Sequence, residues 1–286
     1  RRAPLRRLHG AEAQVRYALV DIDGTLTSSA GAIPGAVGAF SRLRASVAGL
    51  QLVTNQSQES SARTAARVRG LGFDLRAGEV FSAVAAARQV VLRERLRPLY
   101  LLTDAAMEEF EGIPAHEPNA VVVGTAPGEL HYERLTRAMR ALQSDERSML
   151  VAVNKGRYFA RDDGLAMMAG PFVAALEFAT GRAAVVCGKP EPGFFAGGAR
   201  AAAGDGSTPA PRSCVMIGDD ARDDVQGAMD AGMQAILVRT GKYRAGDEAV
   251  LRSPPLGVVD DFASAVELLL AQGILCGEPE GAAQSA

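Results

Sequence analysis

The chain reads Tyr17-Ala18-Leu19-Val20-Asp21-Ile22-Asp23-Gly24-Thr25-Leu26-Thr27 between residues 17 and 27. An apolar run is followed here by two carboxylates one residue apart and then by a glycine, a pattern that predicts a buried strand ending in a loop. Because side chains alternate along a strand, we expect Asp21 and Asp23 to point to the same side. Two neighbouring carboxylates suit phosphoryl transfer, in which one attacks and the other carries a proton.

Two other interpretations of this stretch are a turn rich in Asp and Gly, and a calcium-binding loop. A calcium loop needs Gly at its sixth position and Glu at its twelfth. Counted from Asp21, these positions hold Leu26 and Ala32, so the calcium interpretation fails.

The composition limits the classes of protein to which the chain can belong. Its 286 residues leave room for one large or two moderate domains, and 48% hydrophobic residues suffice for a sizeable core. With a net charge of −2, 5% aromatic residues and no Trp, the chain gives no reason to expect nucleic acid or an anionic membrane as a partner. We also find no apolar run near the roughly 18 residues of a membrane span.

The chain ends and the cysteines bear on location. Residues 1–16 carry five Arg and one Glu without an apolar segment, which argues against a secretory signal. We expect disordered tails at 1–14 and 277–286, with an organellar address in the Arg-rich start as an alternative. The cysteines are odd in number and lack metal-type spacing, so we expect reduced thiols and a cytoplasmic location.

Strand and helix signals alternate along most of the chain, which is typical of an α/β fold built on a Rossmann-like, doubly wound parallel sheet. Strands of this sheet are expected at 17–20, 50–53, 79–81, 183–187, 214–217 and 235–238, the last of these being the final strand. The stretch from about Pro98 to Gly181 has strand signals of its own at 98–102, 120–123 and 149–153. It is large enough to be an inserted domain.

Polar side chains follow three of the predicted strands. The members of this set are Asp21, Asp23, Thr54, Asn55, Asp219, Asp223 and Asp224. Ligands of open parallel sheets bind at the carboxyl ends of the strands, so these groups are expected to converge. Lys189, in a Gly-Lys-Pro turn before a predicted helix, adds a positive charge and backbone N–H groups that favour anions. A Walker loop is excluded, because Pro190 follows Lys189 and Ala183 stands where that loop requires Gly.

The order and spacing of these groups resemble those of the haloacid dehalogenase superfamily of phosphohydrolases. The matching motifs are Asp21–Thr25, Thr54, Lys189 and Gly218–Asp224, and the likeness covers roughly residues 15–272. Members with a large α/β cap, called the C2 type, carry it between the second and third motifs. The resemblance therefore implies a discontinuous catalytic core at 15–84 and 184–276, with a C2-type cap at 85–183.

The resemblance also implies roles for the residues that touch the substrate. Asp21 would be the nucleophile that forms an aspartyl-phosphate, and Asp23 would protonate the leaving oxygen and later activate the water. Thr54 and Asn55 would bind the phosphoryl oxygens, and Lys189 would neutralise charge that it shares with Asp21.

A metal site follows from the same resemblance. Asp21, the backbone carbonyl of Asp23 and Asp219 would hold Mg²⁺, while Asp224 would orient the groups around it. The residue types agree with this assignment, because a set of oxygen ligands favours a hard cation such as Mg²⁺.

The implied activity is that of an Mg²⁺-dependent hydrolase of small phosphorylated molecules, chiefly phosphoric monoesters, with phosphoamides and pyrophosphate as further substrates. A phosphoryl mutase or transferase, and a catalytically weak regulatory or binding protein of the same fold, are the alternatives. Members of this subgroup can carry Ser where Asp23 stands, so the complete Asp-x-Asp pair favours activity.

The predicted cap offers candidates for substrate contact and for assembly. Asn154, Lys155 and Arg157 follow a predicted strand, although a solvated basic turn explains Lys155 and Arg157 equally well. Relatives of this class often pair through their caps, which implies a homodimer through the cap as a partner arrangement.

Overall fold

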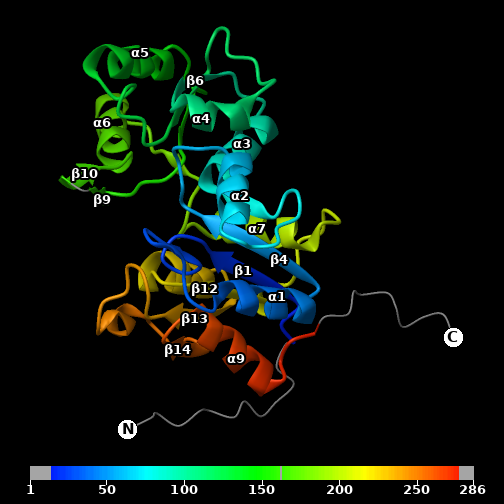
Figure 1. The fold of residues 1–286 in the computed structure, drawn as a ribbon. Helices are drawn as coiled ribbons and strands as arrows, with labels where there is room; N and C mark the ends of the chain where they lie inside the picture. The colour runs from blue at the N-terminus through cyan, green and yellow to red at the C-terminus, as the bar shows by residue number, and fades with distance from the viewer. Residues whose placement is uncertain (1–13, 162, 277–286) are drawn as a thin grey trace, which may run out of the picture.

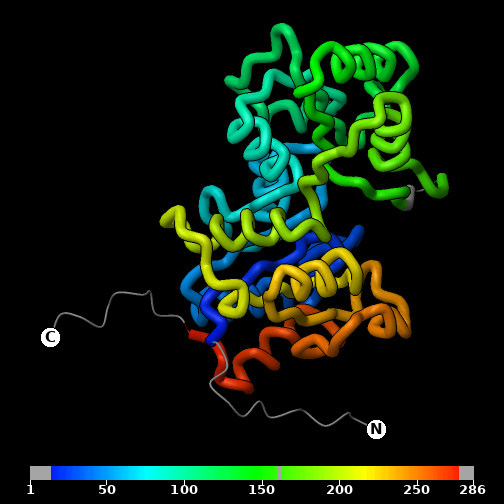
Figure 2. Tube along the Cα trace, turned by 180° about the vertical axis from the view of Figure 1, so that it is seen from behind, coloured from blue at the N-terminus to red at the C-terminus, as the bar shows by residue number. Residues whose placement is uncertain are grey.

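The computed structural model describes residues 14–161 and 163–276, so the predicted tails lie outside the described residues except for Gln14. Two parallel sheets organise this part of the chain, one in the lower and one in the upper half of Figure 1. Seen from behind, helix α7 (Pro192–Ala203, yellow-green) runs along the boundary between the two halves (Figure 2).

The larger sheet is the predicted doubly wound sheet. Its strands are β1 (Tyr17–Asp21), β4 (Gly49–Thr54), β5 (Val80–Ser82), β12 (Cys214–Gly218), β13 (Gln234–Val238) and β14 (Gly257–Val259). They are ordered β14-β13-β12-β1-β4-β5, and every neighbouring pair is parallel. From β1 the chain first adds β4 and β5 on one side, and later adds β12, β13 and β14 on the other side. The strand order therefore reverses at β1.

Helices cover both faces of this sheet. They are α1 (Ala36–Ser46), α2 (Ser61–Gly70), α7, α8 (Gly227–Asp230) and α9 (Phe262–Gln272), whereas α3 (Ala83–Arg93) packs against β5, α7 and the short helix Glu108–Phe110. Ala18 and Val20 of β1 belong to the buried cluster of α1 and α9, whereas Leu19 belongs to the cluster of α7. Because side chains alternate along β1, Asp21 follows Leu19 onto the α7 side.

The smaller sheet lies in the segment predicted as a cap. It has the order β11-β8-β7-β6, again with parallel neighbours. Its strands are β6 (Pro98–Leu101), β7 (Ala120–Val123), β8 (Met149–Ala152) and β11 (Val185–Val186), and its helices are α4 (Asp104–Met107), α5 (Tyr132–Gln143) and α6 (Gly170–Thr180). Two hairpins complete the described strands: β2 (Thr27–Ser28) with β3 (Gly31–Ala32), and β9 (Tyr158–Arg161) with β10 (Gly164–Met167).

The structure corrects two of the predicted strands. The strand predicted at 183–187 for the larger sheet is β11, which pairs with β8 of the smaller sheet. We therefore propose that the cap extends to Val186, beyond the boundary at 184 that the sequence analysis gave. The strand at 235–238 is not the last one either, because β14 follows it and forms the edge of the larger sheet.

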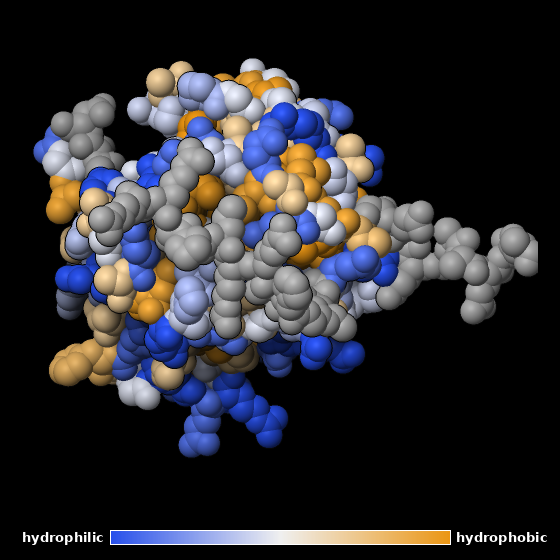
Figure 3. All heavy atoms as spheres, turned by 90° about the horizontal axis from the view of Figure 1, so that it is seen from below, coloured by the Kyte–Doolittle hydropathy of each residue, from blue (hydrophilic) through white to orange (hydrophobic). Residues whose placement is uncertain are grey.

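Figure 3 shows the molecule from below, the side of the lower half that faces away from the upper half. Where described residues are visible from below, hydrophilic and hydrophobic residues are interspersed (Figure 3). Within the described ranges, no helix is long and apolar enough to cross a membrane.

The packing of α7 on the larger sheet yields a stability prediction. The ring of Phe194 is buried, with its centroid 5.4 Å from that of Phe81 and 5.8 Å from that of Phe195. Phe194→Ala should lower the free energy of unfolding by about 3–5 kcal/mol, because it leaves a cavity in a close-packed layer. Urea titration provides the measurement. Phe178→Ala is the matched control, since this ring on α6 is 94% exposed and its loss should change stability by less than about 0.5 kcal/mol.

Candidate active site

The predicted polar residues converge at the carboxyl ends of three adjacent strands. Asp21 ends β1, Thr54 ends the neighbouring strand β4, and Asp219 directly follows β12 on the other side of β1. This is the point at which the strand order reverses, where the loops on either side diverge and leave room for a ligand.

A buried lysine joins two of the carboxylates. Lys189 Nζ lies 2.5 Å from Asp21 Oδ1 and 2.6 Å from Asp224 Oδ1, and all three side chains are almost completely buried. Burial disfavours the charged form of Lys189, but the two carboxylates outweigh it and raise the pKa of the lysine above its ordinary value. The ammonium group is therefore a permanent positive charge beneath the site.

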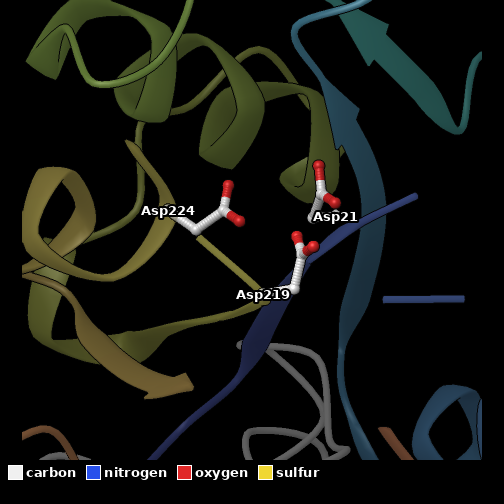
Figure 4. Close-up of side chains that lie close together, drawn as sticks. All are labelled: Asp21, Asp219 and Asp224. Carbon is white, nitrogen blue, oxygen red and sulfur yellow. The ribbon is translucent and has the colours of Figure 1, made fainter. Parts of the chain in front are cut away.

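The carboxylates of Asp21, Asp219 and Asp224 form an acidic triad, in which ligand atoms from all three lie within 4.8 Å of one another. Figure 4 shows the three side chains side by side. Asp21 ends β1, Asp219 directly follows β12, and Asp224 lies in the short π-helix Ala221–Gln226. Asp219 Oδ1 is buried and has no hydrogen-bond partner in the described part of the chain. A buried oxygen without a donor suits a metal cation, so the triad could hold one.

The electrostatics of the triad agree with a cation site. Burial raises the pKa of Asp21 to about 6 although Lys189 opposes it. Burial, followed by the charge of Asp224, raises the pKa of Asp219 to about 6, and burial likewise raises that of Asp224 to about 6. When ionised, three carboxylates and one ammonium leave two negative charges, which a divalent cation would neutralise.

The backbone is shaped closely around Asp219. Its Oδ2 accepts a 2.6 Å hydrogen bond from the N–H of Lys242. A Cβ atom at Gly24 would lie 2.1 Å from this oxygen, and one at Gly241 would lie 2.0 Å from it. Thr240 Oγ1 donates to the carbonyl of Gly24 at 2.5 Å and so ties the two loops together. In this arrangement, only glycine fits at positions 24 and 241 next to the Asp219 carboxylate.

Asp23 lies outside the triad. Its side chain is 53% exposed, accepts a hydrogen bond from Thr27 Oγ1 at 3.3 Å and pairs with Arg67 of α2 at 3.2 Å. It nevertheless lines the same cavity as Asp21, so both carboxylates of the Asp-x-Asp pair face the place where a substrate would bind. The metal contact expected through its backbone carbonyl stays a prediction.

Thr54 and Asn55 differ in how many hydrogen bonds their side chains already make within the protein. Thr54 Oγ1 accepts a hydrogen bond from the N–H of Gln56 at 3.0 Å and keeps its own proton for a ligand. Asn55 holds the Lys189 peptide instead: its Oδ1 accepts from Lys189 N at 2.7 Å, and its Nδ2 donates to Lys189 O at 3.0 Å. We therefore assign Asn55 a positioning role toward Lys189 in addition to the predicted contact with phosphate.

A cavity of about 310 Å³ opens above these residues, between the two sheets. Its lining from the lower half includes Asp21, Asp23, Thr54, Asn55, Gln56, Ser57, Gln58, Lys189 and Lys242, and from the upper half Thr125, Phe159 and Met168. Sequence analysis assigned no site role to the three upper residues, to Gln56, Ser57 and Gln58, or to Lys242, which lies in the loop after β13.

The three cap residues proposed for substrate contact are engaged elsewhere. Asn154 Nδ2 donates to the carbonyl of Asn55 at 3.1 Å and links the two halves. Lys155 pairs with Glu177 at 2.7 Å, and the guanidinium group of Arg157 lies over the ring of Tyr158. The alternative of a basic turn away from the substrate therefore describes Lys155 and Arg157 better.

Comparison with known proteins places this geometry in a family. The model of haloacid dehalogenase-like hydrolases matches residues 18–113, and a second, HAD-hydrolase-like model matches residues 186–265. The human haloacid dehalogenase-like hydrolase domain-containing protein 2 is 44% identical over 256 residues, which cover 90% of this chain and 96% of that protein. The chain belongs to the haloacid dehalogenase-like hydrolase family. The family, the hydrolase class and the α/β fold predicted from the sequence are thus confirmed.

Two further relatives of this haloacid dehalogenase-like hydrolase carry phosphatase names. Human phospholysine phosphohistidine inorganic pyrophosphate phosphatase is 40% identical over 262 residues, 90% of this chain and 95% of that protein. The crystal structure of 4-nitrophenylphosphatase from Thermotoga maritima has a TM-score of 0.78 at 25% identity, covering 88% of this chain and 97% of that one.

The close approach of Gly24 to Asp219 is testable without any assay of activity. In Gly24→Ala, both the positive φ of +98° and the contact with Asp219 Oδ2 oppose the new methyl group. Gly78→Ala is the matched control, because its φ of +81° is similar but its Cβ would meet open space. The control should cost about 1–2 kcal/mol of unfolding free energy, and Gly24→Ala about 1–3 kcal/mol more. Equal costs in urea titrations would contradict the packing described for Asp219.

Proposed function

We propose that this haloacid dehalogenase-like hydrolase removes the phosphoryl group from small phosphorylated molecules in an Mg²⁺-dependent reaction through an aspartyl-phosphate on Asp21. The main support for this proposal is the position of Asp21. Its carboxylate lies 2.5 Å from the buried ammonium group of Lys189 and lines a cavity between the two halves. The phosphatase names of the relatives support the same reaction class. Phosphoric monoesters are the main substrates proposed, and phosphoamides and pyrophosphate the further ones.

In the first step, a carboxylate oxygen of Asp21 attacks the phosphorus atom. A bond forms between this oxygen and phosphorus, the bond to the leaving oxygen breaks, and Asp23 donates a proton to the leaving oxygen. Lys189 beneath Asp21 and the hydroxyl of Thr54 offset the charge on the phosphoryl oxygens. Such transfers depend on positioning and charge compensation, which this arrangement supplies.

In the second step, water replaces Asp21 on phosphorus. The deprotonated Asp23 takes a proton from the water, whose oxygen bonds to phosphorus as the bond to Asp21 breaks, and phosphate is released. The side chain of Asp23 is more than half exposed, and its contacts with Thr27 and Arg67 leave its carboxylate able to face both reactants.

Mg²⁺ would be held by Asp21, Asp219 and the backbone carbonyl of Asp23, with Asp224 completing the acidic triad. When bound, it would neutralise negative charge on the triad and on the phosphoryl oxygens. The pairing of two chains through their caps, inferred from the family resemblance, stays a prediction.

Removing the charge of the nucleophile tests the reaction directly. Asp21→Asn keeps the shape of the side chain but not its attacking oxygen, so turnover of p-nitrophenyl phosphate should fall by about 10³-fold or more. Asp205→Asn is the control, because Asp205 is fully exposed after α7 and should keep full activity. If Asp21→Asn retained a tenth of the activity, another residue would be the nucleophile.

The raised pKa values of the triad predict how Mg²⁺ and pH act together. A carboxyl group whose pKa rises on folding, here from 3.8 to about 6, stabilises the fold below its unfolded pKa and loses this contribution as the pH rises through the folded value. The ionised triad above pH 6 is therefore both the less stable form and the form that binds Mg²⁺. At pH 8, Mg²⁺ at about 100 times its Kd should raise Tm by about 5–10 °C relative to chelator.

At pH 5 this rise should shrink strongly, because protons compete with the cation. Asp219→Asn, which removes one carboxylate, should reduce the rise at pH 8 as well. Differential scanning fluorimetry measures all three values. The same Mg²⁺-induced rise at both pH values, or in Asp219→Asn, would contradict the proposed metal site.

A further inference from the structure

Asp23, the general acid and base of the proposed reaction, has a fixed backbone but an exposed side chain. The N–H of Gly24 donates to the carbonyl of Thr27 at 2.7 Å, so a tight turn holds the main chain beside Asp23. The side chain of Asp23 is 53% exposed and lines the same cavity as Asp21. An exposed carboxylate rotates unless other groups hold it, and proton transfer requires it to stay within hydrogen-bond reach of the reacting oxygens.

The two oxygens of this carboxylate have different surroundings. Thr27 Oγ1 lies 3.3 Å from Asp23 Oδ1, and Arg67 Nη1 lies 3.2 Å from the same atom. The Thr27 hydroxyl is equally far from the carbonyl oxygen of Ile22, so its single proton is divided between two acceptors. Arg67 is therefore the main donor to Oδ1, while Oδ2 makes no hydrogen bond within residues 14–161 and 163–276.

Arg67 is itself held in place on helix α2. Its Nε lies 3.4 Å from Glu59 Oε1, and this oxygen accepts a hydrogen bond from Thr64 Oγ1 at 2.9 Å. The helix buries Thr64, Ala65 and Val68 and contacts β5 of the larger sheet. The guanidinium group thus bridges two carboxylates, and it ties the loop that carries Asp-x-Asp to a packed helix.

Neither stability nor direct contact with a substrate explains this bridge. The side chain of Arg67 is 38% exposed, and ion pairs at such exposure contribute little to the free energy of unfolding. The described residues that line the cavity do not include Arg67, whereas they include Asp23. What the contact does determine is the orientation of the Asp23 carboxylate.

We infer that Arg67 is a positioning residue that holds Asp23 by its Oδ1 atom and thereby directs proton transfer through Oδ2. This inference rests on the proposed phosphatase function. A guanidinium group only donates, so while Oδ1 accepts from it, a proton on the carboxyl group resides on Oδ2. In the first step this proton passes from Oδ2 to the leaving oxygen as the bond from that oxygen to phosphorus breaks. In the second step Oδ2 takes a proton from the water whose oxygen bonds to phosphorus.

The contribution of Arg67 should therefore depend on how strongly the leaving oxygen needs a proton. Phenyl phosphate and p-nitrophenyl phosphate differ only by a nitro group, but phenolate is the more basic and poorer leaving group of the two. Its departure gains more from a general acid. The measured quantity is kcat/KM for each substrate, which covers the steps up to release of the leaving group.

The test compares Arg67→Met, which keeps an unbranched stem but removes the guanidinium group, with Arg67→Lys, which keeps a charged donor. Arg42→Met is the matched control. Arg42 on α1 forms an exposed ion pair with Glu267 on α9 at 2.9 Å and is not among the described residues that line the cavity.

In Arg67→Met, kcat/KM for phenyl phosphate should fall about 5-fold more than kcat/KM for p-nitrophenyl phosphate. This is a part of the roughly 10²–10⁴-fold effect of general acid–base catalysis. Arg67→Lys should restore part of the difference, and Arg42→Met should leave both values unchanged. The Tm of Arg67→Met should agree with that of Arg42→Met within about 2 °C, since each variant loses exposed ion pairing.

A double-mutant cycle shows whether Arg67 acts through Asp23. Asp23→Asn removes the proton carrier and should itself reduce kcat/KM more for phenyl phosphate than for p-nitrophenyl phosphate. Adding Arg67→Met to Asp23→Asn should bring no further difference between the two substrates, because the group that Arg67 orients no longer transfers a proton.

Each opposite result has a separate meaning. Equal losses on both substrates in Arg67→Met, or the same 5-fold difference when Arg67→Met is added to Asp23→Asn, overturn the role of Arg67 and leave the phosphatase proposal intact. Equal losses on both substrates in Asp23→Asn overturn the proton-carrying role of Asp23 and the role of Arg67 with it. Wild-type protein that hydrolyses neither substrate overturns the phosphatase proposal as well.

Discussion

The ion cluster of Lys189 with Asp21 and Asp224 is the interaction on which the site depends. The three charges are buried, so each is tolerated only because an opposite charge lies within 2.6 Å. Replacing such a cluster by apolar residues often stabilises a protein, which means that stability alone does not explain it. Its arrangement leaves an excess of negative charge beside a fixed ammonium group, a combination that suits a divalent cation and a phosphoryl group.

The parallel sheet brings the members of this cluster together. Asp21 ends the strand at which the order reverses, and Asp219 and Asp224 follow the neighbouring strand β12. Lys189 reaches them from the loop before α7, where the side chain of Asn55 holds both the N–H and the carbonyl of Lys189. Three separate segments of the chain therefore fix one another in position before any ligand binds.

The loop at residues 55–60 connects this chemistry to the cap. The side chain of Thr103 donates a hydrogen bond to the carbonyl of Gln58, and that of Asn154 donates to the carbonyl of Asn55. In the same loop, Ser60 Oγ donates to Glu108. Thr125 is attached to the same loop through Ser57. Because the loop also follows Thr54, the groups that would bind phosphate and the upper half of the structure share one rigid connection.

The amino-acid sequence by itself determined the parallel α/β fold and the inserted second sheet, since both depend on local periodicity. It missed the short strand β14 and assigned β11 to the wrong sheet, because two or three residues carry too little periodicity to identify a partner. Only the tertiary structure decided that Asp224 belongs to the acidic triad, that Asn55 holds Lys189, and that Lys242 and Thr125 line the cavity. These relations join residues far apart in the chain, as Asn55 and Lys189 are at a separation of 134 residues. They follow from how the loops approach one another in space, which no local pattern encodes.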